Sequence, residues 1–305
     1  MRKSIWSSVM VMALLLTVAA PIPGLAATDF FTDDNGNIHE ANINKIAELG
    51  ITKGCETTLY CPAQSVTRDT MATFLARAMN LPAVATNYFS DDNGNLHEAN
   101  INKIADIGVT KGCAVGLFCP FDLVTRAQMA SFLARALGLP AATIDRFTDD
   151  TGNVHEADIN KIAAAGITIG CNLDGTKFCP SDPVRRDEMA SFLARAVNYG
   201  LNRWPTVSIT SPANLATFQT TWNGSAYVAT VTLAAAVSDP DGDAVTVQWF
   251  SSVQGPGLTG ATVEATLAIP PGQDSSQPII TATATDSEGA SSSASIQLKL
   301  IVPSP

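Results

Sequence analysis

The sequence has few of the residues on which catalysis usually depends. Its 305 residues include only three histidines, and charged residues make up 15% of the chain. No Gly-x-Ser-x-Gly, His-Glu-x-x-His or phosphate-loop sequence occurs, so the common hydrolase, metalloprotease and nucleotide-binding signatures are missing. The sequence therefore predicts a protein that is not an enzyme and that has no cofactor.

Basic charge is also scarce. The formal net charge is -10, and beyond residue 200 the only basic residues are Arg203 and Lys299. An acidic chain is repelled by nucleic acid and by anionic membrane surfaces, so neither is expected as a partner. If this protein binds an anion, we expect the binding site to lie within the first 200 residues.

Long apolar runs are confined to the beginning of the chain. A basic head, Met1 to Lys3, precedes an apolar run from Val9 to Ala20, and small residues follow at Gly24 and Ala26. This pattern is typical of a secretory signal peptide, here residues 1–26. The run is shorter than the roughly 20 residues that a spanning helix needs, and no later stretch is long enough. We expect an exported chain without a membrane span.

The chain has six cysteines, and all of them follow the signal peptide. Cysteines in an exported protein are usually paired as disulfides. Among the possible pairings, the short-range one is the simplest because it closes the same small loop each time. The predicted pairs are Cys55–Cys61, Cys113–Cys119 and Cys171–Cys179.

The cysteine loops belong to an internal repeat. Phe31, Phe89 and Phe147 follow one another at intervals of 58 residues. Each unit has an Asp-Asp-x-Gly-Asn turn, a short amphipathic helix, the cysteine loop and a longer helix, which gives repeats 28–84, 85–142 and 143–200. A two-helix unit buries too little on its own, so the three repeats are expected to share a core in a pseudo-threefold bundle.

These repeats resemble a known family. The phrases F-x-D, I-x-x-I-A-x-x-G-I-x-x-G, F/Y-C-P and V-T-R-x-x-M-A-x-F-L-A-R-A are similar to those of the S-layer homology repeat, in its cysteine-containing version, over residues 30 to 197. The resemblance implies an all-helical trefoil with three grooves, which anchors exported proteins to anionic cell-wall polysaccharide, often carrying pyruvate.

The resemblance also implies the glycan-binding residues. They are the arginine at the start of each second helix and the aspartate of each F-x-D phrase: Arg68, Arg126, Arg186, Asp33, Asp91 and Asp149. A cation beside the positive end of a helix is unfavourable, so a partner is expected, either an internal carboxylate or an external anion, and we favour the anion. None of the copies keeps the family's Thr-Arg-Ala-Glu ending, and Thr125 with Gln128 also fits a simple capping box.

Two patterns in the repeats suggest a metal but are better explained without one. The histidines hold one repeat position, His39, His97 and His155, where capping or packing is a more frequent role than zinc binding. The Asp-Asp-Asn-Gly-Asn turn resembles a calcium loop, but Asn44 occupies the place of the required final glutamate. Asx turns and helix capping account for the turn, so no metal is predicted.

From Trp204 onward the apolar residues alternate with period two, as in half-buried strands. Residues 205–305 resemble bacterial immunoglobulin-like and PKD-type modules, which implies an antiparallel sandwich. Asn223-Gly224 predicts a hairpin. The acidic residues Asp239, Asp241, Asp243 and Asp286 could hold calcium, but turn formation is the favoured explanation.

Together these patterns predict a multidomain fold: an all-α pseudo-trimeric bundle of S-layer homology repeats followed by an all-β immunoglobulin-like sandwich. The predicted function is a non-catalytic, secreted cell-surface protein anchored to anionic cell-wall polysaccharide, with the sandwich as spacer or adhesion module. The alternative is a secreted carbohydrate- or protein-binding adhesin whose active surface is the sandwich.

Overall fold

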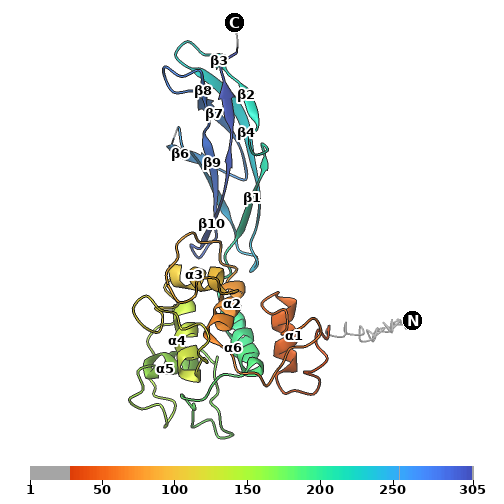
Figure 1. Ribbon diagram of the computed structural model, residues 1–305, viewed down its shortest axis with the longest axis vertical. Coiled ribbons are helices and arrows are strands. Elements are labelled where there is room, and N and C mark those ends of the chain that lie inside the picture. The colour runs from red at the N-terminus through yellow and green to blue at the C-terminus, as the bar shows by residue number, and fades with distance from the viewer. Residues whose placement is uncertain (1–27, 254, 304–305) are drawn as a thin grey trace, which may run out of the picture.

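The protein is seen here as a computed structural model, which describes residues 28–253 and 255–303. Helices occupy the first part of this range and strands the second, and the strands extend away from the helices toward the C-terminus (Figure 1). The predicted signal peptide, residues 1–26, lies outside the described residues. The helices are α1 Glu40–Glu48, α2 Arg68–Ala78, α3 Glu98–Asp106, α4 Arg126–Ala136, α5 Glu156–Ala164 and α6 Arg186–Tyr199.

The second helix of each repeat packs against the first helix of the next repeat. α2 contacts α3, α4 contacts α5, and α6 returns to contact α1. The buried faces follow the apolar spacing of the sequence, and Ile43 and Ile46 on α1 are fully buried. Gly50 has a φ of 70°, which is favourable for glycine, and it follows the C-terminal end of α1. The three repeats therefore close into a ring.

A cycle of backbone hydrogen bonds joins the three repeats at the point where their second helices begin. The Val66 N–H donates to the Val184 carbonyl, the Val184 N–H to Val124, and the Val124 N–H to Val66, each at 2.9 Å. All three valine side chains are buried. This cycle places the starts of α2, α4 and α6 around one pseudo-threefold axis.

The strands form three sheets. In the first, β4 pairs with β1, β3 and β7; the second has the order β10-β9-β5-β6; and the third has the order β2-β11-β8, in which β2 and β11 are parallel. The predicted hairpin at Asn223-Gly224 joins β3 to β4. The strands are β1 Thr206–Ser211, β2 Thr217–Gln219, β3 Thr221–Trp222, β4 Tyr227–Ser238, β5 Thr246–Ser251, β6 Gly255–Thr259, β7 Thr262–Ala268, β8 Ser275–Ser276, β9 Ile279–Thr285, β10 Ser291–Gln297 and β11 Lys299–Ile301.

The predicted fold class is wrong. Helix takes up only 23% of the described residues and strand 25%, and the strands make several sheets instead of the two of an immunoglobulin-like sandwich. The repeats are not all-α because their cysteine loops are rich in glycine and proline and contain left-handed residues such as Cys61 and isolated β-bridges such as Glu56↔Leu59. The short strand β8 lies between Pro271 and Pro278 and pairs with β11, outside the two four-stranded sheets.

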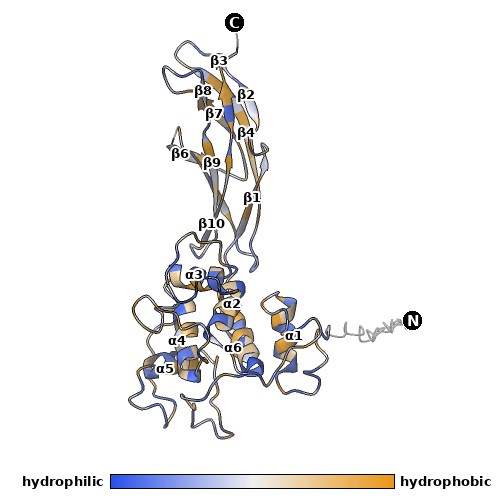
Figure 2. Cartoon of the chain, in the orientation of Figure 1, coloured by the Kyte–Doolittle hydropathy of each residue, from blue (hydrophilic) through white to orange (hydrophobic). Residues whose placement is uncertain are grey.

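Each region has its own apolar core. The core of the repeats gathers side chains from all six helices, and that of the strands is centred on residues such as Leu233, Trp249 and Ile280. Each helix presents both hydrophobic and hydrophilic residues (Figure 2), as expected for a helix with one buried face. None of the helices within the described residues has the length and apolar character needed to cross a membrane.

Candidate functional site

The three predicted arginines lie between repeats. Each begins a second helix, and its Nε donates to a backbone carbonyl in the cysteine loop of the next repeat: Arg68 to Phe118 at 2.7 Å, Arg126 to Phe178 at 2.8 Å and Arg186 to Tyr60 at 2.7 Å. The side chains are only 4–6% exposed. The arginines therefore fasten each repeat to the following one.

Aromatic rings enclose each guanidinium. The Arg68 carbon Cζ lies 4.8 Å from the Phe118 ring centroid and 5.6 Å from that of Phe132, and the other two arginines have equivalent pairs of rings. Burial lowers the pKa of all three arginines from a value high enough that they stay charged. Each site is a buried cation between two rings.

The backbone amides at these helix starts already have protein partners. The Arg68 N–H donates to the Asp122 carbonyl at 2.9 Å and the Asp69 N–H to the Pro120 carbonyl at 3.0 Å, and the other two repeats have the same pair of bonds. Backbone amides at a helix N-terminus can bind an anion when they are free. The first two amides of these helices are not free, because they donate to carbonyls of neighbouring loops.

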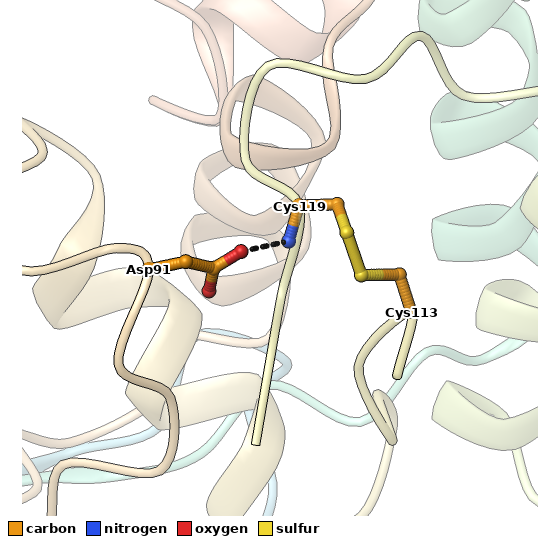
Figure 3. Close-up of side chains that lie close together, drawn as sticks. All are labelled: Asp91, Cys113 and Cys119. Atoms are coloured by element: carbon orange, nitrogen blue, oxygen red, sulfur yellow. Dashed lines mark hydrogen bonds between the residues drawn. A yellow bond between two sulfur atoms is a disulfide. The ribbon is translucent and has the colours of Figure 1, made fainter. Parts of the chain in front are cut away.

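The predicted aspartates hold the cysteine loops. In Figure 3 the Asp91 carboxylate points at the loop, and its two oxygens accept hydrogen bonds from the N–H groups of Phe118 at 2.7 Å and Cys119 at 2.8 Å. Asp33 and Asp149 bind the equivalent amides in their own repeats. Each aspartate thus fixes the loop whose carbonyl receives the arginine of the preceding repeat.

The cysteines close these loops as disulfides, which join Cys55 to Cys61, Cys113 to Cys119 and Cys171 to Cys179. Two of the pairs lie within ligand distance of an aspartate, as Asp91 does with Cys113 and Cys119. A metal needs free thiolates, and disulfide sulfurs do not supply them. These two groups of residues are therefore not metal sites.

The three histidines pack across three separate repeat interfaces. Nδ1 of His39 lies 2.7 Å from Ser191 Oγ, His97 lies 2.7 Å from Thr73 Oγ1, and His155 lies 2.8 Å from Ser131 Oγ. Burial lowers the pKa of His155. The structure does not bring these imidazoles together.

Two grooves lie beside the arginines. The first, which we call the Arg68 groove, has a volume of about 250 Å³ and is lined by Arg68, Lys111, Gln128, Arg135 and His155 among others. The second, the Arg126 groove, has a volume of about 740 Å³. Its lining includes Arg126, Ile169, Leu173, Glu188, Arg195 and His39.

The two grooves differ in charge although their repeats are equivalent. In the Arg68 groove, Lys111 and the neutral Gln128 accompany Arg68 and Arg135. The Arg126 groove has Ile169 at the position of Lys111, and Glu188 Oε1 lies 3.6 Å from Arg126 Nη1. Asp122 also lines the Arg68 groove, so three cations there accompany one carboxylate, whereas the two arginines of the Arg126 groove accompany Glu188 and Asp174. Of these two grooves, the Arg68 groove therefore has the more positive lining.

The capping box that was considered for the start of α4 is present in the structure. Thr125 and Gln128 form the capping box, with both hydrogen bonds at 3.2 Å. Arginines also recur inside the second helices, as Arg77, Arg135 and Arg195, and each donates to a backbone carbonyl of its own repeat, as Arg135 does to Val109 at 3.2 Å. Arg135 also lines the Arg68 groove.

Sequence reasoning missed the aromatic partners of the arginines and the counter-charge at Glu188. The aromatic residue before each second cysteine is visible in the sequence, as Tyr60, Phe118 and Phe178. Its pairing with an arginine from another repeat depends on how the three repeats close into a ring, and the spacing of residues within one repeat does not reveal this. Glu188 is visible in the sequence at the position of the family's glutamate, but its contact with Arg126 of another repeat is not.

The strand region contains two further places that were considered as functional sites, a cavity and an aspartate-rich turn. A cavity of about 540 Å³ is lined mainly by apolar side chains such as Leu233, Trp249 and Ile280, with Glu264 as its titratable group. Asp239 Oδ1 accepts the N–H groups of Asp241 and Asp243, which is the predicted turn chemistry. Neither place combines an acid and a base in the way that catalysis requires.

Comparison with known proteins finds similarity to surface-layer proteins. No protein-family model matches the chain. The chain is 30% identical over 206 residues to the S-layer protein Sap of Bacillus anthracis, which covers 63% of this chain and 24% of that protein. It is 29% identical over 199 residues to an S-layer protein of Bacillus licheniformis, covering 63% and 22%.

A third relative has a different description. An endoglucanase of Bacillus sp. strain KSM-635 is 34% identical over 99 residues, which is 32% of this chain and 10% of that enzyme. The chain spans about a quarter of the length of the S-layer proteins that it matches. The similarity therefore concerns a segment of those proteins and leaves the greater part of each unmatched.

Proposed function

We propose that this chain is a non-catalytic cell-surface protein that binds anionic cell-wall polysaccharide in the grooves between its repeats. The observation that carries the proposal is the Arg68 groove, where Arg68, Lys111 and Arg135 line one cavity with a single carboxylate, Asp122. A groove of this kind suits a carboxylate-bearing sugar, because cations supply charge and the ring of Phe132 supplies an apolar wall. The S-layer relatives support the same function.

The predicted site residues have different parts in this proposal. Arg68 and Arg126 give the two grooves a positive floor. All three arginines, Arg186 included, also bond two repeats together. Asp33, Asp91 and Asp149 act on the glycan through the cysteine-loop rim that they hold. The strand region, with one basic residue between 205 and 303, serves as spacer or adhesion module.

The ligand side of the proposal can be tested with cell walls. The full chain is mixed with purified sacculi, either intact or stripped of their secondary polysaccharide by mild acid, and then sedimented. We expect the protein to sediment with intact sacculi and to stay in solution with stripped ones. Equal sedimentation with both preparations would show that peptidoglycan itself, or nothing specific, is recognised.

A further inference from the structure

The second aspartate of each Asp-Asp-x-Gly-Asn turn is buried without a partner. Asp34, Asp92 and Asp150 are 1%, 0% and 1% exposed. Neither carboxylate oxygen of any of them has a hydrogen-bond partner within the described residues. Burying a carboxylate without a hydrogen-bond partner or counter-charge strongly lowers the stability of a protein. Here the same buried carboxylate occurs in all three repeats.

Turn formation does not account for these carboxylates. Asx turns were expected to explain Asp34, Asn35 and Asn37, and Asn37 Oδ1 does accept the His39 N–H at 2.8 Å. The Asp34 backbone carbonyl accepts the Asn37 N–H, but within the described residues its side chain accepts no hydrogen bond from another residue. Both carboxylate oxygens of the adjacent Asp33 accept hydrogen bonds from N–H groups of the cysteine loop.

The charges near these carboxylates are negative. Asp29, Glu40 and Asp33 act on Asp34; Glu98 and Asp91 act on Asp92; and Asp145, Glu156 and Asp149 act on Asp150. Burial raises the pKa of all three aspartates. No lysine or arginine is among these neighbours, and within the described residues none of the three carboxylates forms a salt bridge.

A second carboxylate folds over each turn. Glu40 Oε2 accepts the Gly36 N–H at 2.7 Å, and Glu98 and Glu156 make the same bond to Gly94 and Gly152 at 2.7 and 2.6 Å. The glycines have φ near 77°, which lets the chain turn back sharply. Each loop thus gathers two carboxylates within seven residues and leaves Asp34, Asp92 or Asp150 unsatisfied.

We propose that each of the loops 33–40, 91–98 and 149–156 binds one calcium ion. The buried aspartate of each loop is the principal ligand, and Glu40, Glu98 or Glu156 is the second carboxylate. Carboxylate, amide and backbone oxygens are the ligands of a hard divalent cation. The histidine of each loop is hydrogen-bonded across the repeat interface and the nearby cysteines are disulfides, so the donor set does not favour zinc or copper.

The bound ion would strengthen the interfaces that carry the grooves. Asn37 Nδ2 donates to Asp187 Oδ2 at 3.1 Å and Asn95 Nδ2 to Asp69 Oδ2 at 3.0 Å, so two of the loops contact a second helix of another repeat. A loop fixed by calcium holds these contacts in place. Calcium is therefore expected to raise the thermal stability of the ring.

The test measures calcium on the full chain. After treatment with a chelator, the protein is titrated with Ca²⁺ by calorimetry, and the triple variant Asp34→Asn/Asp92→Asn/Asp150→Asn is titrated in parallel. We expect the triple variant to bind three fewer ions than the parent. Any ions held by the aspartates of the strand region contribute equally to both proteins and cancel in the difference.

Single variants keep the test decisive if the triple variant does not fold. Each of Asp34→Asn, Asp92→Asn and Asp150→Asn should lose one ion, and Asp106→Asn, which removes a carboxylate outside the loops, should lose none. Calcium at about 1 mM, within the range for extracellular sites, should raise the midpoint of thermal unfolding of the parent. Equal stoichiometry in parent and loop variants, or a melting midpoint unaffected by calcium and chelator, would overturn the proposal.

Discussion

At the scale of single residues, each repeat arginine is bonded to the next repeat through its Nε. The buried Nη2 atoms of Arg68 and Arg186 have no partner within the described residues, whereas Nη2 of Arg126 donates to the Gly170 carbonyl. Replacement by alanine would therefore remove a repeat contact as well as a charge. Variants that keep the charge separate the two effects.

Arg68→Lys should lower the free energy of unfolding by about 1–3 kcal/mol, because lysine cannot keep both the bond to the Phe118 carbonyl and the ring contacts. Chemical denaturation checks this value. Arg146→Lys, at an exposed arginine of repeat 3, is the matched control and should change little. Equal effects of the two substitutions would contradict the role given to Arg68.

The contact between Glu188 and Arg126 leads to a second residue-level prediction. Glu188→Gln keeps an acceptor for the Arg185 N–H but removes the negative charge 3.6 Å from Arg126. Affinity for intact sacculi should rise about two- to fivefold, as for removal of a part-exposed counter-charge. Gln128→Glu in the Arg68 groove is the converse variant and should lower affinity. A fall in affinity with Glu188→Gln together with a rise with Gln128→Glu would show that the grooves do not select an anion.

At the scale of elements, the cysteine loop is held at two points, by its disulfide and by an aspartate. Cys113→Ser/Cys119→Ser should cost about 2 kcal/mol of stability, which is the loop-closure value for so short a loop. Thermal unfolding of the folded double variant measures it. No loss of stability would mean that Asp91 alone fixes the loop.

The buried aspartates of the loops 33–40, 91–98 and 149–156 should make the free energy of unfolding depend on pH, and bound calcium should abolish this dependence. In chelator, Asp34, Asp92 and Asp150 have folded pKa values raised above 3.8, so their contribution is present below pH 3.8 and is lost as the pH rises through the folded pKa. The unfolding free energy of the parent, relative to the triple asparagine variant, should fall as the pH rises above 3.8 and through the raised folded pKa values when calcium is absent. With calcium it should not fall. The same pH dependence with and without the ion would contradict this.

Much of the local structure could be predicted from the sequence. The spacing of Ile43 and Ile46 predicted the buried face of α1, and the short, repeated cysteine spacing predicted loops that the structure closes with disulfides. The fold class could not, because the loop-rich repeats and the separation of the strands into three sheets depend on long-range pairing such as β2 with β11. The burial of Asp34 was also invisible, since the sequence shows two adjacent aspartates but not that they face different ways.

At the scale of the whole molecule, the grooves and the strand region are joined by a short segment bound to the repeats. The Trp204 N–H donates to the Met79 carbonyl at 2.8 Å, and Asn80 Nδ2 donates to the Trp204 carbonyl at 2.8 Å. The basic residues lie almost entirely on the repeat side of this segment. Binding to an anionic wall is therefore expected to depend on the repeats and to be insensitive to charge changes among the strands.

The most direct test of the central claim reverses charge at the groove rims in the full chain. Lys111 lines the Arg68 groove, and Lys53 holds the same repeat position in the first copy; both are exposed. Lys53→Glu/Lys111→Glu should weaken sedimentation with intact sacculi by about tenfold or more, because each site then faces an anion with like charge. Lys45→Glu/Lys299→Glu carries the same net change on α1 and β11 and should bind like the parent. If the groove variant sediments as well as this control while both remain folded, the grooves do not hold the wall polysaccharide.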